Sequence, residues 1–170
     1  MVTPRAEPGL QAGEREMLTG WLDYHRATLA WKCEGLTDDQ LRERSVPPSG
    51  LSLLGLVRHL AECERSWFRN VLLGADLPYL YSTPQDMDAD FNDTGGADAA
   101  TVLRTWEQEC AAARDAVAGV DLDTLSKKGD RRTGEPFSLR WILTHMIEEY
   151  ARHNGHADLL RERIDGATGD

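Results

Sequence analysis

The chain has 170 residues, of which 41% are hydrophobic and 28% are charged, and its formal net charge is −10. This length suits one domain with a sizeable core. The acidic balance argues against nucleic acids and anionic membrane surfaces as partners, because both are bound through clustered Lys and Arg. There is no apolar run long enough to span a membrane, and residues 1–13 lack the apolar stretch of a secretory signal, so we expect a cytoplasmic protein.

Three cysteines, Cys33, Cys63 and Cys110, are widely spaced and form no CxxC pair. An odd, sparse set in a chain without a signal sequence is typical of reduced thiols. We therefore expect small, packed side chains at these positions, with Cys63 as a weaker candidate for a ligand.

The first predicted helix covers residues 14–34, where apolar residues recur with helical spacing and Gly35 supplies a stop. Residues 1–13 are expected to form a loosely ordered N-terminal segment. A short extra turn is predicted over 37–44, opened by the capping signature that begins at Thr37.

The second predicted helix runs from Ser52, as N-cap, to Leu73, and Gly74 ends it. The following segment, 75–96, is polar and rich in Pro, Gly and Asn. A connection of this length inside a compact domain is more often functional, or a crossover, than idle.

A third helix is predicted over 98–117, and a fourth from Ser138 to about Ile164, ended by Gly166. The polar segment 119–136 joins them, and no stretch alternates convincingly enough to predict a strand. The sequence therefore predicts an all-α fold: one domain, residues 1–170, built as an antiparallel-type four-helix bundle with long crossover loops.

The chemistry-bearing residues concentrate on the fourth helix. Glu149, His153 and His156 stand at i, i+4 and i+7 and share one ridge, which His145 extends upstream. On the second helix, His59 also lies at the border of the apolar stripe. Bundles build metal sites from such side chains on facing helices.

Two imidazoles and one carboxylate, from His59, Glu149 and His153, would suit zinc, nickel or iron(II) and leave positions open for water or substrate. The spacing alone also fits a plainer interpretation. In that case Glu149 pairs with Arg152 or another surface base, and both histidines are hydrogen-bonded core residues.

Three segments carry a resemblance to a known family: DYHRATLAWKCEGLTDDQL (23–41), SLLGLVRHLAECERSWF (52–68) and SLRWILTHMIEEYARHNGHADLLRERIDG (138–166). They resemble the DinB/YfiT-like superfamily and, within it, the DUF664 or mini-circle protein branch. The similarity spans nearly the whole chain.

The resemblance implies a four-helix bundle that binds a divalent metal through one His of the second helix and two residues four apart on the last. Many members have HxxxH there, whereas this chain departs from the pattern with Glu149 before His153. A His/Glu/His set of this kind is similar to the zinc site of the mycothiol-dependent maleylpyruvate isomerase. His59, Glu149 and His153 are accordingly the expected ligands, with zinc favoured over nickel or iron.

Other histidines receive weaker assignments. His156 occupies the position of the family's Gln, so it is expected either beside a ligand or at the substrate, or else on the helix surface. His25 is expected to line the cavity or to be a hydrogen-bonded core residue. His145 is expected to be structural.

The resemblance further implies a thiol S-transferase that joins a low-molecular-weight thiol to small electrophiles, in detoxification or stress. The basic residues are mostly Arg, which is typical of a GC-rich genome, and this favours mycothiol as cosubstrate. The nucleophile would be a metal-bound thiol or water. A metal-dependent hydrolase and a non-catalytic metal-binding bundle remain alternatives, and a homodimer is left open.

Overall fold

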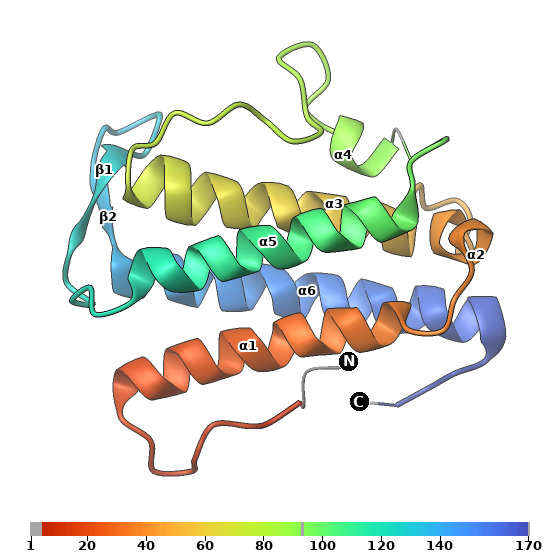
Figure 1. The fold of residues 1–170 in the computed structure, drawn as a ribbon, viewed down its shortest axis with the longest axis horizontal. Helices are drawn as coiled ribbons and strands as arrows, with labels where there is room; N and C mark the ends of the chain where they lie inside the picture. The colour runs from red at the N-terminus through yellow and green to blue at the C-terminus, as the bar shows by residue number, and fades with distance from the viewer. Residues whose placement is uncertain (1–4, 93, 170) are drawn as a thin grey trace.

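The structure is a computed structural model that describes residues 5–92 and 94–169. Four long helices pack side by side along most of their length (Figure 1), which confirms the predicted helical fold. They are α1 (Glu14–Cys33), α3 (Leu53–Glu64) with its π-helical continuation η1 (Arg65–Leu72), α5 (Ala99–Val117) and α6 (Leu139–Asp165). The shorter elements are α2 (Asp38–Arg42), α4 (Ala89–Asn92), β1 (Leu125–Gly129) and β2 (Pro136–Ser138).

The closest-packed neighbours are α1 with α6 and α3 with α5, and each of these pairs runs in the same direction (Figure 1). The expectation of antiparallel neighbours is therefore wrong for these pairs. The reason is the segment between η1 and α5, which carries the chain back along the bundle before α5 begins. Helix α3 remains antiparallel to α6, the helix against which its His59 lies.

The helix ends lie where the capping residues predict. The side chains of Ser52, Asp98 and Ser138 each accept a hydrogen bond from the backbone N–H three residues on, which satisfies an otherwise unpaired donor. Gly166 ends α6 with φ of 77°, a left-handed conformation that glycine adopts without strain.

A small antiparallel hairpin, β1–β2, lies in the connection where no strand was predicted. Leu125 pairs with Ser138 and Gly129 with Pro136. These strands are too short to show the alternation of apolar and polar residues that predicts a strand. Their two backbones approach closely, and a Cβ on Gly129 would lie 2.2 Å from the carbonyl oxygen of Gly134. Glycine is required there because no side chain fits.

A buried ion pair ties the helices together at the centre of the bundle. Glu64 of α3, which is 0% exposed, accepts two hydrogen bonds from Arg26 of α1 at 2.8 and 2.6 Å. Tyr150 of α6 donates to Glu64 at 2.8 Å, and Trp106 of α5 donates to Tyr150 at 2.8 Å. One network thus fixes all four long helices in register.

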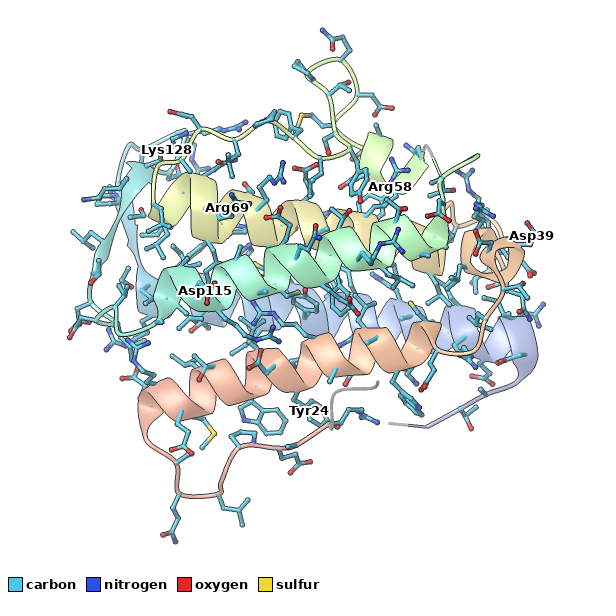
Figure 2. The ribbon with its side chains drawn as sticks, in the orientation of Figure 1. Tyr24, Asp39, Arg58, Arg69, Asp115 and Lys128 are labelled. Carbon is cyan, nitrogen blue, oxygen red and sulfur yellow. The ribbon has the colours of Figure 1, made fainter. Side chains whose placement is uncertain are left out.

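The segment between η1 and α5 is anchored to α3. The carboxylate of Glu62 accepts backbone N–H groups from Leu80, Tyr81 and Ser82. Arg58, near α4 in Figure 2, donates to the carbonyl of Ala89 at 3.0 Å. These contacts hold the segment along the bundle and set α4 over α3.

At the N-terminal end, residues 1–4 lie outside the described residues, and Arg5 donates to Thr28 and Tyr24 of α1. The loosely ordered state expected for residues 1–13 stays a prediction. Across the described residues, helices that combine the length and the apolar character needed to cross a bilayer are absent.

Candidate metal centre

Three side chains from two helices converge between α3 and α6. The Nε2 atom of His59 lies 3.1 Å from Oε1 of Glu149, and Nε2 of His153 lies 3.3 Å from the same oxygen. One ligand-type atom from each residue falls within 4.8 Å of the other two. The structure therefore brings together the three residues that the sequence singled out.

The helices position this cluster through ordinary amphipathic packing. Glu149 and His153 stand one turn apart on α6, so their side chains stack along the helix axis. His59 faces them from α3, which packs against α6. The side chains of His59, Glu149 and His153 are 19%, 12% and 9% exposed, so the cluster lies at the edge of the core with a limited opening to solvent.

Asp90, which no sequence pattern indicated, completes the surroundings of His59. The Nδ1–H of His59 donates to the Asp90 carboxylate at 2.8 Å, and the carboxylate is 4% exposed. The ring of Phe91 stacks on the imidazole with 4.3 Å between centroids. Both residues belong to α4, in the polar segment whose length alone suggested a role.

The donor set fits a divalent metal ion. With metal–ligand bonds of about 2.0 to 2.1 Å, tetrahedral coordination places neighbouring donor atoms about 3.3 Å apart, close to the two short separations in this cluster. The bond from His59 Nδ1 to Asp90 leaves Nε2 as the nitrogen that can bind the ion, an arrangement common around zinc. The residues present are therefore suited to such an ion.

The cluster is electrostatically coupled. Burial opposes protonation of His59, but its hydrogen bonds to Asp90, Cys63 and Glu149 outweigh this and raise its pKa to about 11. A metal ion bound at Nε2 would therefore take the place of a proton there, because a ligand imidazole is neutral. Hydrogen bonds from His153 and His59 hold the pKa of Glu149 well below its ordinary value. The carboxylate thus stays ionised, as a ligand must.

Of the other His and Cys residues considered as ligands or substrate contacts, some lie beside the cluster and others do not. Nδ1 of His156 lies 3.4 Å from Nδ1 of His153, so His156 is next to the cluster. Sγ of Cys63 lies 3.5 Å from Nε2 of His59. His25 is elsewhere, between α1 and α6, with Nδ1 3.3 Å from the amide nitrogen of Asn154. His145 stacks on Trp141, 5.0 Å between centroids, as a structural residue would.

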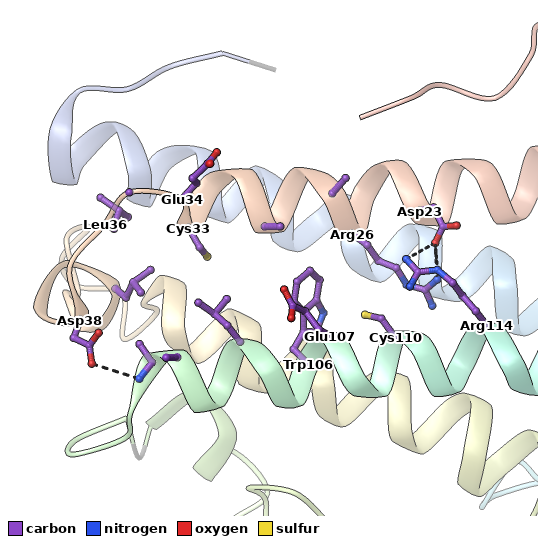
Figure 3. Close-up of a pocket in the computed structure, with 17 residues that line it drawn as sticks. Asp23, Arg26, Cys33, Glu34, Leu36, Asp38, Trp106, Glu107, Cys110 and Arg114 are labelled. Carbon is purple, nitrogen blue, oxygen red and sulfur yellow. Dashed lines mark hydrogen bonds and ion pairs between the residues drawn. The ribbon is translucent and has the colours of Figure 1, made fainter. Parts of the chain in front are cut away.

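A cavity of about 640 Å³ opens between α1 and α5 (Figure 3). Asp23 bridges Arg26 and Arg114 at its wall, as the dashed lines in Figure 3 mark. The residues lining this cavity include none of the His/Glu/His cluster. The size of this cavity is therefore no evidence that it is the substrate site of the candidate metal centre.

The fold and the cluster together define a helical bundle with a candidate metal centre between two of its helices. A model of the mycothiol-S-transferase family matches residues 17–166, and the chain belongs to that family. This confirms the resemblance and supports a mycothiol-related function, with a small-molecule thiol as substrate. A comparison with curated proteins returns no match.

Proposed function

We propose that this protein joins mycothiol, through its sulfur, to a small electrophile, using a divalent metal ion held by His59, Glu149 and His153. The observation that carries the proposal is the convergence of two imidazole nitrogens and a carboxylate oxygen at ligand-like separations. Membership of the mycothiol-S-transferase family supplies the thiol. Nitrogen and carboxylate donors favour zinc, with nickel and iron(II) as alternatives.

The chemical need is for a thiolate at neutral pH. A free thiol has a pKa of about 8.5 and is mostly protonated, and a bound divalent ion would supply the positive charge that favours its ionised form. The chain's part is to keep Glu149 ionised and to fix the ring of His59 through Asp90. The low exposure of the three side chains limits their contact with bulk water, which would compete with the thiol.

The protein's own three thiols are poor alternatives as nucleophiles, and burial raises the pKa of each of them, Cys63 included. Burial raises the pKa of Cys33 to about 12. Burial also raises the pKa of Cys110, whose Sγ lies 3.6 Å from the buried Glu64 carboxylate. A sulfur supplied by the cosubstrate is therefore the better nucleophile, since it enters as a separate molecule.

The transfer itself balances without a redox step. The thiol loses its proton to solvent, its sulfur forms a bond to the electrophilic carbon, and the leaving group departs with the electron pair of the broken bond. With bromobimane as electrophile, the products are a bimane thioether, bromide and a proton. No oxidant or reductant is needed.

The test combines metal analysis with turnover. Glu149→Gln keeps the shape of the side chain and removes its charge, so it should lose most of the bound zinc and the mycothiol-dependent turnover of bromobimane. Glu148→Gln is the matched control, because Glu148 is the exposed neighbour that pairs with Arg152, and it should bind zinc as the unaltered chain does. Equal zinc binding by both variants would remove Glu149 from the proposed site, and turnover without any thiol would favour hydrolysis.

A further inference from the structure

A second cavity, of about 570 Å³, lies beside η1, at the end of the bundle that carries the hairpin. Its walls come from three segments: η1 contributes Ser66, Trp67 and Asn70, the following loop contributes residues 76–79, and the hairpin contributes residues 128–131. Asn70 fixes the loop by donating to the carbonyl of Leu77 and accepting from its N–H. The wall of the cavity that the loop forms is therefore held in place by specific hydrogen bonds.

The chemistry of the lining is polar, aromatic and balanced in charge. Its charged groups are Asp76, Lys128, Asp130 and Arg131, two acidic and two basic. Asp76 and Lys128 form an ion pair, and a guanidinium nitrogen of Arg131 lies 3.5 Å from the hydroxyl of Tyr79. The aromatic rings of Trp67, Tyr79 and Phe137 complete the walls. Hydrogen-bonding groups beside aromatic faces suit a neutral, polyhydroxylated ligand better than an anion.

This cavity and the candidate metal centre lie along the same two helices. His59, Cys63 and Trp67 are spaced four residues apart along α3 and η1, so they follow one ridge. Eight residues of helix place Trp67 roughly 12 Å from His59 along the axis. Trp67 also contacts His145, 4.7 Å between ring centroids, and His145 stands one turn before Glu149 on α6. The same two helices thus connect the cavity to the cluster.

We propose that this cavity holds the sugar portion of the thiol cosubstrate while its sulfur reaches the centre formed by His59, Glu149 and His153. The inference rests on the proposed function for the position of the sulfur. Mycothiol is an elongated molecule whose acetylated cysteine is joined to glucosamine and inositol, so it carries many hydroxyls and no ionised group besides its thiol. Its neutral body matches the balanced charge of the cavity, and its elongated shape suits a binding site whose two parts lie roughly 12 Å apart along the helix.

The same reasoning predicts which thiols are rejected. A peptide thiol such as glutathione would bring two carboxylates and one ammonium group, a net negative charge, into a cavity whose own charges cancel. Burying an unpaired carboxylate there would be unfavourable. The cavity is therefore a specificity determinant for glycosidic thiols.

The experiment fills the cavity without touching the metal centre. Ser66→Leu adds a larger side chain to the wall on a helical position. Gln108→Leu adds the same residue to an exposed position of α5 and is the matched control. Tyr79→Ala, at a side chain that is 39% exposed, is a second variant that does not depend on accommodating added bulk. Zinc content is measured for every variant and should be unchanged.

Two measurements follow on the zinc-loaded proteins. Bromobimane turnover compares mycothiol with N-acetylcysteine, which lacks the sugars. Ser66→Leu and Tyr79→Ala should each raise KM for mycothiol by about tenfold, which corresponds to about 1.4 kcal/mol, and leave KM for N-acetylcysteine within about twofold of the unaltered chain. Calorimetry with thiol-free, N-acetylated glucosaminyl-inositol should detect binding to the unaltered chain and to Gln108→Leu, and weaker binding to the two cavity variants.

The two proposals fail differently. Turnover with mycothiol whose KM is unaffected by both cavity variants, together with sugar binding that is absent or equal in all proteins, would overturn the cavity proposal and leave the transferase intact. Sugar binding that the cavity variants weaken, in a protein that turns over no electrophile with any thiol, would support the cavity and overturn the transferase.

Discussion

Asp90 offers the sharpest test of how the candidate centre is held together. Asp90→Asn keeps the side-chain volume at a nearly buried position and removes the charge that faces His59 Nδ1 at 2.8 Å. A hydrogen bond to a charged group contributes about 1.5 to 3 kcal/mol, against about 1 kcal/mol for a neutral one. A loss of about 1 to 2 kcal/mol weakens zinc binding by about 5- to 30-fold, within reach of the 10- to 100-fold typical of such residues.

The assay is competition for zinc between the purified chain and a chromophoric chelator. Asp88→Asn is the control, because Asp88 is exposed and lies just before α4. It should leave zinc affinity unchanged, and circular dichroism should show equal helix content in both variants. The reasoning is refuted if Asp90→Asn binds zinc as tightly as the unaltered chain, or if Asp88→Asn weakens it as much.

Three further predictions concern the fold. Glu64→Gln removes the buried counter-charge of the Arg26 guanidinium and leaves it only the more exposed Asp23, so urea unfolding should show a loss of up to about 3 to 5 kcal/mol; a loss below about 1 kcal/mol would mean that the pair is dispensable. Burial raises the pKa of Cys33 from 9.0 to about 12, so the unfolded chain releases this proton first and stability falls as pH rises through that window. In Cys33→Ala, the free energy of unfolding should therefore fall less steeply between pH 9 and 10.5, by up to about 1.4 kcal/mol per pH unit. Urea unfolding at each pH measures this, and an unchanged dependence of the free energy on pH would contradict it. Gly129→Ala places a Cβ against the backbone of Gly134, so it should cost about 1 to 3 kcal/mol and disturb the hairpin, seen in amide exchange; full protection there would show that the hairpin tolerates a side chain.

The predictable part of the site was the part carried by regular helices. Glu149 and His153 are four residues apart and so share one face of their helix however that helix packs; their spacing alone placed them together. His59 stood at the border of its own apolar stripe, which fixed the side of the helix on which it would lie. The resemblance then selected this trio over the plainer interpretation that the same spacing allowed.

Asp90 could not be found in that way. It lies in a polar segment without periodicity, and its position depends on the backbone hydrogen bonds that Glu62 makes to residues 80–82 and on the contact of Arg58 with Ala89. Those contacts join residues far apart in sequence, so no local pattern records them. The cavity beside η1 is similar, because its walls come from three separate segments.

The sequence by itself determined the four long helices and their ends, because apolar periodicity and capping side chains act within a few residues of one another. Only the tertiary structure decided that α3 and α5 run in the same direction, that Glu64 meets Arg26 and Tyr150 in the core, and that Asp90 supports His59. The physical reason is that these features depend on long-range packing, where a buried charge is tolerated only if a partner from a distant segment reaches it.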